Sequence, residues 1–131
     1  MIVLDSSAAV EWLLGRAGAS EVAEHLGDPE ASIHAPSILP VEVMAAVRGL
    51  VLGGHATARR GREALDDLTA TDVTYHEPMI LQARAWELRS NLSTYDATYV
   101  ALAELLGAVL VTADRRIARA PGLRARLATV G

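Results

Sequence analysis

Two aspartates stand where a parallel sheet would present chemistry. Asp5 follows the apolar run 2–4, and Asp114 follows the continuous apolar run 108–112. In open parallel sheets the binding crevice lies beyond the carboxyl ends of the strands. We therefore expect both carboxylates to face one crevice. The structural alternative is that each Asp only caps the helix that follows it.

Two further carboxylates lie on apolar helix faces. Helical spacing aligns Glu42 with Ile38, Ala45 and Gly49, and aligns Asp96 with Leu92, Tyr99, Val100 and Ala103. An inward carboxylate is costly unless it is paired, protonated or metal-bound. The alternative to metal binding is an arginine pair, with Arg48 or Arg89 nearest in sequence, because the chain contains no lysine.

If the fold gathers these four carboxylates, their mutual repulsion requires cations. Oxygen ligands alone favour Mg²⁺ or Mn²⁺ over zinc. The chemistry suited to such a pocket is metal-assisted phosphodiester hydrolysis. The hydroxyls of Ser6 and Thr112, beside the strand-end aspartates, could position a water or a phosphate oxygen, although helix capping explains them equally well.

The elements that must position these residues alternate along the chain. Strands are predicted at 2–4, 31–35, 72–76, 108–112 and 127–130, and helices at 6–14, 20–26, 37–52, 59–68, 78–88, 94–107 and 113–120. Ser6 or Ser7 is expected to cap the first helix, and Thr94 the sixth. The alternation predicts an α/β fold, with a central parallel β-sheet flanked by helices on both faces. Trp12, Trp86 and Tyr99 fall at helical positions expected in the core.

Composition limits the class of protein. A chain of 131 residues, 51% hydrophobic, predicts a single domain over 1–131. It has no cysteine, so disulfides and thiol chemistry are excluded, and we expect a cytoplasmic protein without a membrane segment. Its four histidines show no ligand spacing and receive no catalytic role.

The charge is unevenly distributed. All 12 basic residues are arginine and the net charge is -4, so any nucleic-acid contact must be local. Five of the arginines lie between 114 and 131, a stretch with one acid. Arg115 and Arg116, next to Asp114, are the candidates for phosphate contact, and a solvated helix face is the alternative.

Three segments together carry a family resemblance: IVLDSSAAVEWLL, SILPVEVMAAV and LSTYDATYVALAELLGAVLVTADRRIARA. With these motifs the whole chain resembles PIN-domain ribonucleases of the VapC toxin type. The resemblance implies a PIN fold and a magnesium-dependent endoribonuclease, the toxin of a type II toxin-antitoxin system, with Mn²⁺ as a substitute metal. It also implies RNA as substrate, a VapB-type antitoxin as partner and a homodimer.

The resemblance assigns residues as well. Motif matching makes Asp5, Glu42, Asp96 and Asp114 the catalytic and metal-binding acids, here called the acidic quartet, with Ser6 and Thr112 as accessory residues. Some relatives carry a further acid two residues after the last aspartate, where this chain has Arg116, and that difference concerns the number of metal ions.

Two other classes remain as alternatives. A receiver or phosphatase domain also places an Asp after its first strand, but such families use a lysine near the phosphoryl group, and the chain has none. A non-catalytic PIN-like binding module would keep the fold and act only through a partner. RNA cleavage that requires magnesium would separate the nuclease from both.

Overall fold

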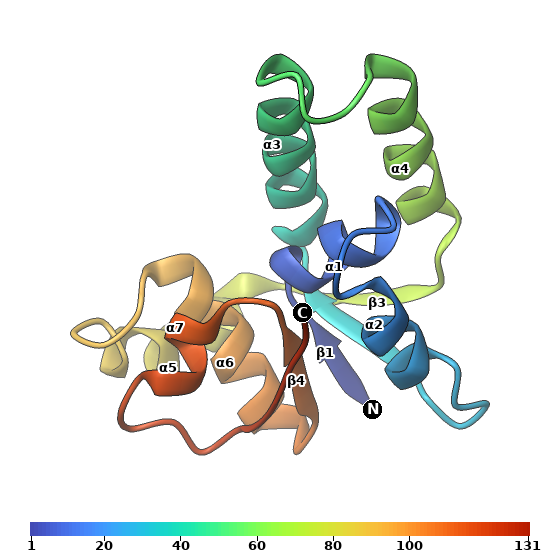
Figure 1. Cartoon of the computed structure of the whole chain (residues 1–131). Coiled ribbons are helices and arrows are strands. Elements are labelled where there is room, and N and C mark those ends of the chain that lie inside the picture. Colours follow the sequence, from blue (N-terminus) through green and yellow to red (C-terminus); the bar gives the residue numbers. More distant parts are fainter.

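Five short strands form one sheet at the centre of the molecule (Figure 1). The computed structural model describes residues 1–131. The strands are β1 (Ile2–Leu4), β2 (Ile33–Pro36), β3 (Val73–His76), β4 (Val109–Thr112) and β5 (Arg126–Thr129). All neighbours are parallel, in the order β3-β2-β1-β4-β5. This confirms the predicted parallel sheet and places β1 and β4 side by side.

Helices cover the sheet on its two sides (Figure 1). They are α1 (Ser6–Leu13), α2 (Ala19–Leu26), α3 (Leu39–Leu52), α4 (Ala58–Ala70), α5 (Gln82–Glu87), α6 (Thr94–Leu106) and α7 (Arg115–Arg119), with the 3-10 turn η1 (Pro78–Leu81) before α5. The helix α6 packs on β1, β2 and β4, and α1 packs on α2, α3 and α4. The pair α3 and α4 projects away from the sheet. None of these helices is long and apolar enough to cross a membrane.

The core is made from β1, β4 and α6. Val3, Leu4, Leu110 and Val111 are fully buried, and so is nearly every side chain of α6 from Ala97 to Ala103. Small alanines in that stretch let the helix lie close to the sheet. Both elements are continuous apolar runs in the sequence because nearly all of their side chains are buried. The helix ends at Gly107, whose φ of +62° is the left-handed conformation that glycine adopts without a steric penalty.

The helix caps differ from those predicted. The N-cap of α1 is Asp5, not Ser6 or Ser7, and the N-cap of α6 is Ser93, not Thr94. In each case the residue one position earlier has the extended backbone that a cap requires, and its side chain accepts the backbone N–H three residues on. Asp114 caps α7 and accepts the N–H of Arg116. The strand-end aspartates are therefore true caps.

The expectation that Trp86 lies in the core is wrong. The predicted helix over 78–88 is divided into η1 and the six-residue α5, which packs mainly on α6. The outer side of α5 has no covering layer, so Trp86 is 67% exposed, with the Arg89 guanidinium 4.8 Å from its ring centroid. Tyr99 is buried as expected, and Trp12 is partly buried against the core.

Candidate active site

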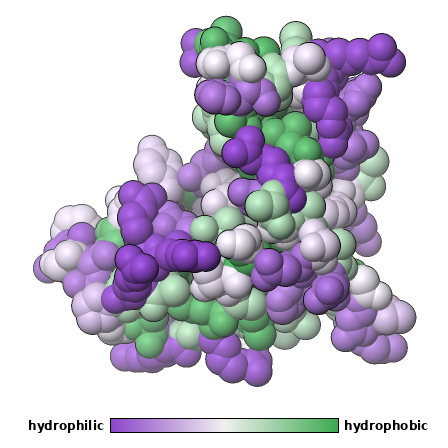
Figure 2. All heavy atoms as spheres, in the orientation of Figure 1, coloured by the Kyte–Doolittle hydropathy of each residue, from purple (hydrophilic) through white to green (hydrophobic).

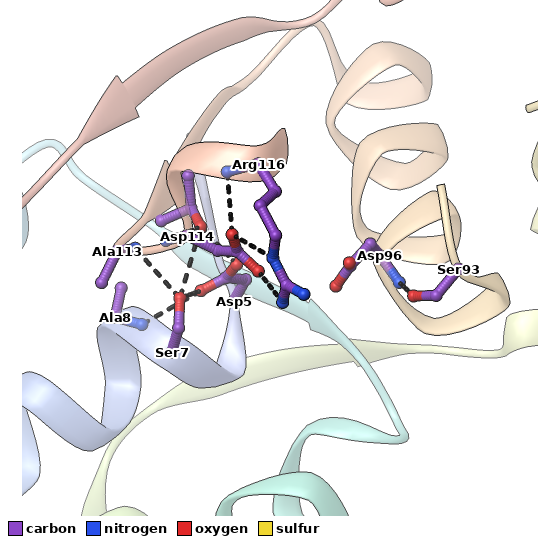
Figure 3. A network of polar contacts seen from close by, with 9 residues as sticks. Asp5, Ser7, Ala8, Ser93, Asp96, Ala113, Asp114 and Arg116 are labelled. Carbon is purple, nitrogen blue, oxygen red and sulfur yellow. Dashed lines mark hydrogen bonds and ion pairs between the residues drawn. The ribbon is translucent and has the colours of Figure 1, made fainter. Parts of the chain in front are cut away.

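Asp5 sits at the junction of β1 and α1 and is only 3% exposed. Thr112 Oγ1 donates to Asp5 Oδ2 at 2.6 Å, and Ser7 Oγ donates to Oδ1 at 2.6 Å (Figure 3). The backbone N–H of Ala8 donates to Oδ1 at 3.0 Å. Three donors therefore fix the orientation of this carboxylate. Oδ1 accepts two of them and Oδ2 accepts one, so Oδ2 keeps a lone pair for another contact.

Ser7 and Thr112 join the carboxyl ends of β1 and β4. Ser7 Oγ accepts the N–H of Ala113 at 3.0 Å, and Thr112 Oγ1 accepts the N–H of Asp114 at 3.0 Å. The two hydroxyl oxygens are 3.3 Å apart. This network couples the position of Asp5 to that of Asp114 (Figure 3).

Sequence reasoning missed Ser7. It named Ser6 as the accessory hydroxyl, but Ser7 is the serine that contacts Asp5. The Ser6 hydroxyl lies next to the Tyr99 hydroxyl instead. The only local signal was that Ser7, like Ser6, is a hydroxyl residue that closely follows Asp5; its contacts with Thr112 and Ala113 exist only once β1 and β4 are paired.

Glu42 is held in place by a tyrosine from another helix. It lies in the first turn of α3, and Tyr99 Oη, on α6, donates to Glu42 Oε1 at 2.7 Å. Burial and the adjacent Glu42 carboxylate raise the pKa of Tyr99, so the phenol keeps its proton and remains a donor. Tyr99 was predicted only as a core residue, and it is also a positioning residue.

Asp96 and Asp114 differ in their pairing. Asp96 lies in the first turn of α6, which Ser93 caps, and forms no ion pair. Asp114 is held side-on by Arg116: Nε donates to Oδ1 at 3.1 Å and Nη2 donates to Oδ2 at 2.7 Å. Arg48 and Arg89, the arginines predicted as alternative partners, contact none of the four carboxylates. Arg115 donates instead to the carbonyl oxygen of Gly131.

The carboxylates influence one another electrostatically. Burial raises the pKa of Asp5, Glu42 and Asp96, and the charge of another quartet member raises each pKa further. Hydrogen bonds oppose this effect at Asp5 and Glu42. The guanidinium of Arg116 lowers the pKa of Asp114. The quartet is thus one region of concentrated negative charge, with a single cation at one side.

The quartet suits a hard divalent cation in its chemistry, and differs from a closed ligand shell in its geometry. Its donors are carboxylate and hydroxyl oxygens, the ligands that Mg²⁺ and Mn²⁺ prefer. Three of its members carry raised pKa values that a cation would relieve. No three acidic or histidine side chains are gathered closely enough to enclose an ion, and Asp114 is engaged by Arg116.

Comparison with known families identifies the family to which the chain belongs. Residues 2–123 match the PIN domain family. The chain is a PIN-domain protein of the VapC type. It is 42% identical to ribonuclease VapC9 of Mycobacterium tuberculosis over 119 residues, which covers 89% of this chain and 88% of that protein. It is 36% identical to ribonuclease VapC12 of the same organism over 130 residues, 99% of each chain.

Solved structures agree with this PIN assignment at the level of fold. VapBC2 from Rickettsia felis, bound to a promoter DNA fragment, matches with a TM-score of 0.67 and 17% identity over 100% of both chains. The sarcin-ricin loop cleaving toxin VapC20 of Mycobacterium tuberculosis matches with a TM-score of 0.69 and 17% identity over 91% of this chain and 94% of its own. The PIN family match and the 36 to 42% identical relatives exclude the receiver and phosphatase alternatives. PIN-domain ribonucleases of the VapC type generally depend on divalent cations.

Proposed function

We propose that this PIN-domain protein is a magnesium-dependent endoribonuclease and the toxin of a type II toxin-antitoxin pair. One observation carries the proposal: Asp5, Glu42, Asp96 and Asp114 come from four separate elements and form one electrostatically coupled group. The relatives that share the fold at 36 to 42% identity are named ribonucleases.

The proposed roles follow from the contacts of each residue. The quartet holds the cation, with Mn²⁺ as an alternative to Mg²⁺, and a bound cation of this kind lowers the pKa of water and stabilises charge on phosphate oxygens. Thr112 and Ser7 orient the Asp5 carboxylate, and Tyr99 orients Glu42. Ser6 remains a proposed accessory residue beside Tyr99. Asp5, Glu42 and Asp96 must be ionised to serve as ligands. Because their pKa values are raised, they ionise at a higher pH than ordinary carboxylates do.

RNA would approach across α7. Figure 2 shows hydrophilic side chains gathered over this helix, and its sequence RRIAR supplies Arg115, Arg116 and Arg119. We assign phosphate contacts to Arg115 and Arg116, because these two residues directly follow Asp114 in the chain. Such contacts bind RNA without reading its sequence and weaken as salt rises.

Partners and location follow from the same assignment. A VapC-type toxin acts with a VapB-type antitoxin, and the fold neighbour from Rickettsia felis is named as a VapBC assembly. We propose a homodimer as the basic unit. The cytoplasm, where RNA is available, is the proposed location.

Cleavage mapping tests the proposal. Total RNA is incubated with wild type, Asp5→Asn and the control Asp66→Asn, an exposed acid on α4 outside the site, with magnesium or with chelator. We expect discrete cuts from wild type and the control in magnesium only. The same cuts from Asp5→Asn, or cuts by wild type in chelator, would contradict a metal-dependent nuclease. No cuts from wild type under any condition would favour the non-catalytic binding module.

A further inference from the structure

Arg116 is the only cation paired with the acidic quartet. Its Nε and Nη2 atoms donate to the two oxygens of Asp114, at 3.1 and 2.7 Å. Asp5, Glu42 and Asp96 form no ion pair with any arginine. The four carboxylates therefore carry a formal charge that Arg116 offsets at one member only.

The guanidinium lies on the side of Asp114 that faces Asp96 (Figure 3). From there its charge lowers the pKa of Asp114 and opposes the rise that burial causes in the pKa of Asp96. It thus lies within the cluster of negative charge that a bound divalent ion would neutralise. Both cations require the oxygens of Asp114.

The Arg116 side chain can leave without disturbing the fold. It is 85% exposed, while the Asp114 side chain is 17% exposed. The cap of α7 uses the backbone N–H of Arg116, which donates to Asp114 Oδ1 at 2.9 Å, and does not need the guanidinium. An exposed, flexible arginine on a mostly buried carboxylate is a mobile counter-charge rather than a packing element.

We propose that Arg116 is a tethered cation that competes with the divalent metal ion for Asp114 and so sets the metal affinity of the site. The proposal rests on the proposed function, because it assumes that the quartet holds a metal. In the metal-free protein the guanidinium neutralises Asp114, and metal binding requires it to swing away.

Titration calorimetry with Mn²⁺ on metal-free protein tests this competition without any catalytic readout. Arg116→Ala should bind Mn²⁺ about three- to fivefold more tightly than wild type, the effect of removing one partly exposed ion pair. Arg119→Ala is the matched control, because Arg119 lies on the same helix, is exposed and contacts no acid. It removes the same charge, and its Mn²⁺ affinity should stay within about twofold of wild type, since an exposed charge beyond contact distance is largely screened.

A second pair of variants separates competition from a general charge effect. In the Asp114→Asn background, Arg116→Ala should change the Mn²⁺ affinity no more than Arg119→Ala does, because the contested carboxylate is gone. Circular dichroism melts in chelator confirm that each variant is folded, and Arg116→Gln replaces Arg116→Ala if the alanine variant is not.

The outcomes are distinct. If wild type binds Mn²⁺ and cleaves RNA while Arg116→Ala has the affinity of Arg119→Ala, the competition is overturned and the proposed function stands. A gain that persists unchanged in the Asp114→Asn background also overturns it. If wild type and the arginine variants neither bind Mn²⁺ nor cleave RNA, the proposed function fails, and this inference fails with it.

Discussion

Asp5 performs two tasks with one side chain. As the N-cap of α1 it accepts the Ala8 N–H, and as a buried carboxylate it is oriented by Ser7 and Thr112 toward the region that it shares with Glu42 and Asp96. Capping uses Oδ1, and Oδ2 keeps a lone pair for the proposed metal ligation, so the two interpretations of a strand-end aspartate are compatible.

At this scale the sequence singles out candidate acids but does not predict which side chains hold them in place. Asp5, Glu42, Asp96 and Asp114 stand out through apolar surroundings and strand ends, which are local signals. The contacts of Thr112 with Asp5 and of Tyr99 with Glu42 join residues 107 and 57 positions apart. No local pattern reveals such contacts, because they exist only once the sheet has formed.

Amide substitutions should separate chemistry from folding. We expect Asp5→Asn, Glu42→Gln, Asp96→Asn and Asp114→Asn each to lower RNA cleavage by at least about tenfold, because losing one metal ligand costs more than about 1.4 kcal/mol of transition-state stabilisation. Cleavage rates with melting curves on the same preparations provide the measurement. Full activity in any two of these folded variants would refute the quartet assignment.

The raised carboxylate pKa values predict an unusual pH dependence for the metal-free protein. At Asp5, Glu42 and Asp96 the folded state favours the protonated form, so their stabilising contribution is complete below the ordinary carboxylate pKa and is lost as pH rises through the raised values. Asp114 has the opposite sign, and its contribution is lost as pH falls through its lowered pKa. At Glu104 burial is outweighed by the pairing with Arg84, which lowers the pKa, so this group has the same sign as Asp114. Comparing wild type with Asp96→Asn therefore isolates the contribution of one group with a raised pKa.

Urea unfolding in chelator, from about pH 4.5 to about pH 8, measures this dependence. As pH rises across that interval, the free energy of unfolding of wild type should fall relative to that of Asp96→Asn, because the variant lacks one carboxyl whose pKa is raised. Equal slopes for the two proteins would show that Asp96 ionises in the folded state as it does in the unfolded chain.

Arg84 connects three elements of the outer layer. From α5 it donates to both oxygens of Glu104 on α6, at 2.6 and 3.2 Å, to Glu87 at 3.0 Å and to the Gly122 carbonyl oxygen at 2.8 Å. Glu104 also accepts the Arg124 N–H at 2.6 Å. These contacts attach α5 and the segment between α7 and β5 to α6, the helix that carries Asp96 and Tyr99.

Arg84→Ala should therefore lower the free energy of unfolding by about 1 to 3 kcal/mol, because it leaves the mostly buried Glu104 carboxylate without its bidentate partner. Arg59→Ala is the matched control: its pair with Glu63 is solvent-exposed and should contribute about 0 to 1 kcal/mol. Urea midpoints and slopes for the two variants give the comparison. If Arg84→Ala lowers the free energy of unfolding no more than Arg59→Ala does, Arg84 does not hold these elements together.

Elements were the most predictable level of this fold. Every strand and helix was predicted in the right order, since strands such as Val109–Thr112 are continuous apolar runs and helices end at glycines such as Gly107. The exceptions were boundaries. The division of 78–88 into η1 and α5, and the caps at Asp5 and Ser93, depend on backbone geometry at single residues, which apolar periodicity does not determine.

At the scale of the whole molecule, α5 exposes an aromatic side chain that nothing within the chain covers. Trp86 is largely exposed, and with Met79, Ile80 and Tyr95 it gives the η1–α5–α6 side large exposed apolar side chains. The helical position of Trp86 predicts a buried side chain, whereas the single chain leaves it exposed. Burial against a second copy of the chain would account for both. We expect Trp86→Glu to weaken the proposed homodimer at least about tenfold, as truncating an aromatic anchor does.

Light scattering after size exclusion, over a range of protein concentrations, measures that equilibrium. Leu52→Glu is the control, since it places a charge at an equally exposed apolar position on α3. Loss of the dimer with Leu52→Glu but not with Trp86→Glu would move the interface from α5 to α3.

Thermal melting of two proteins tests most directly whether the quartet is a metal site. Wild type and Asp5→Asn are melted in chelator and in millimolar magnesium at neutral pH. In chelator Asp5→Asn should melt at or above wild type, because it removes a buried charge whose pKa is raised. In magnesium the order should reverse, because the ion binds only the folded state and the variant lacks a ligand. If wild type gains nothing from magnesium or manganese and Asp5→Asn is less stable in both buffers, these carboxylates do not form a metal site.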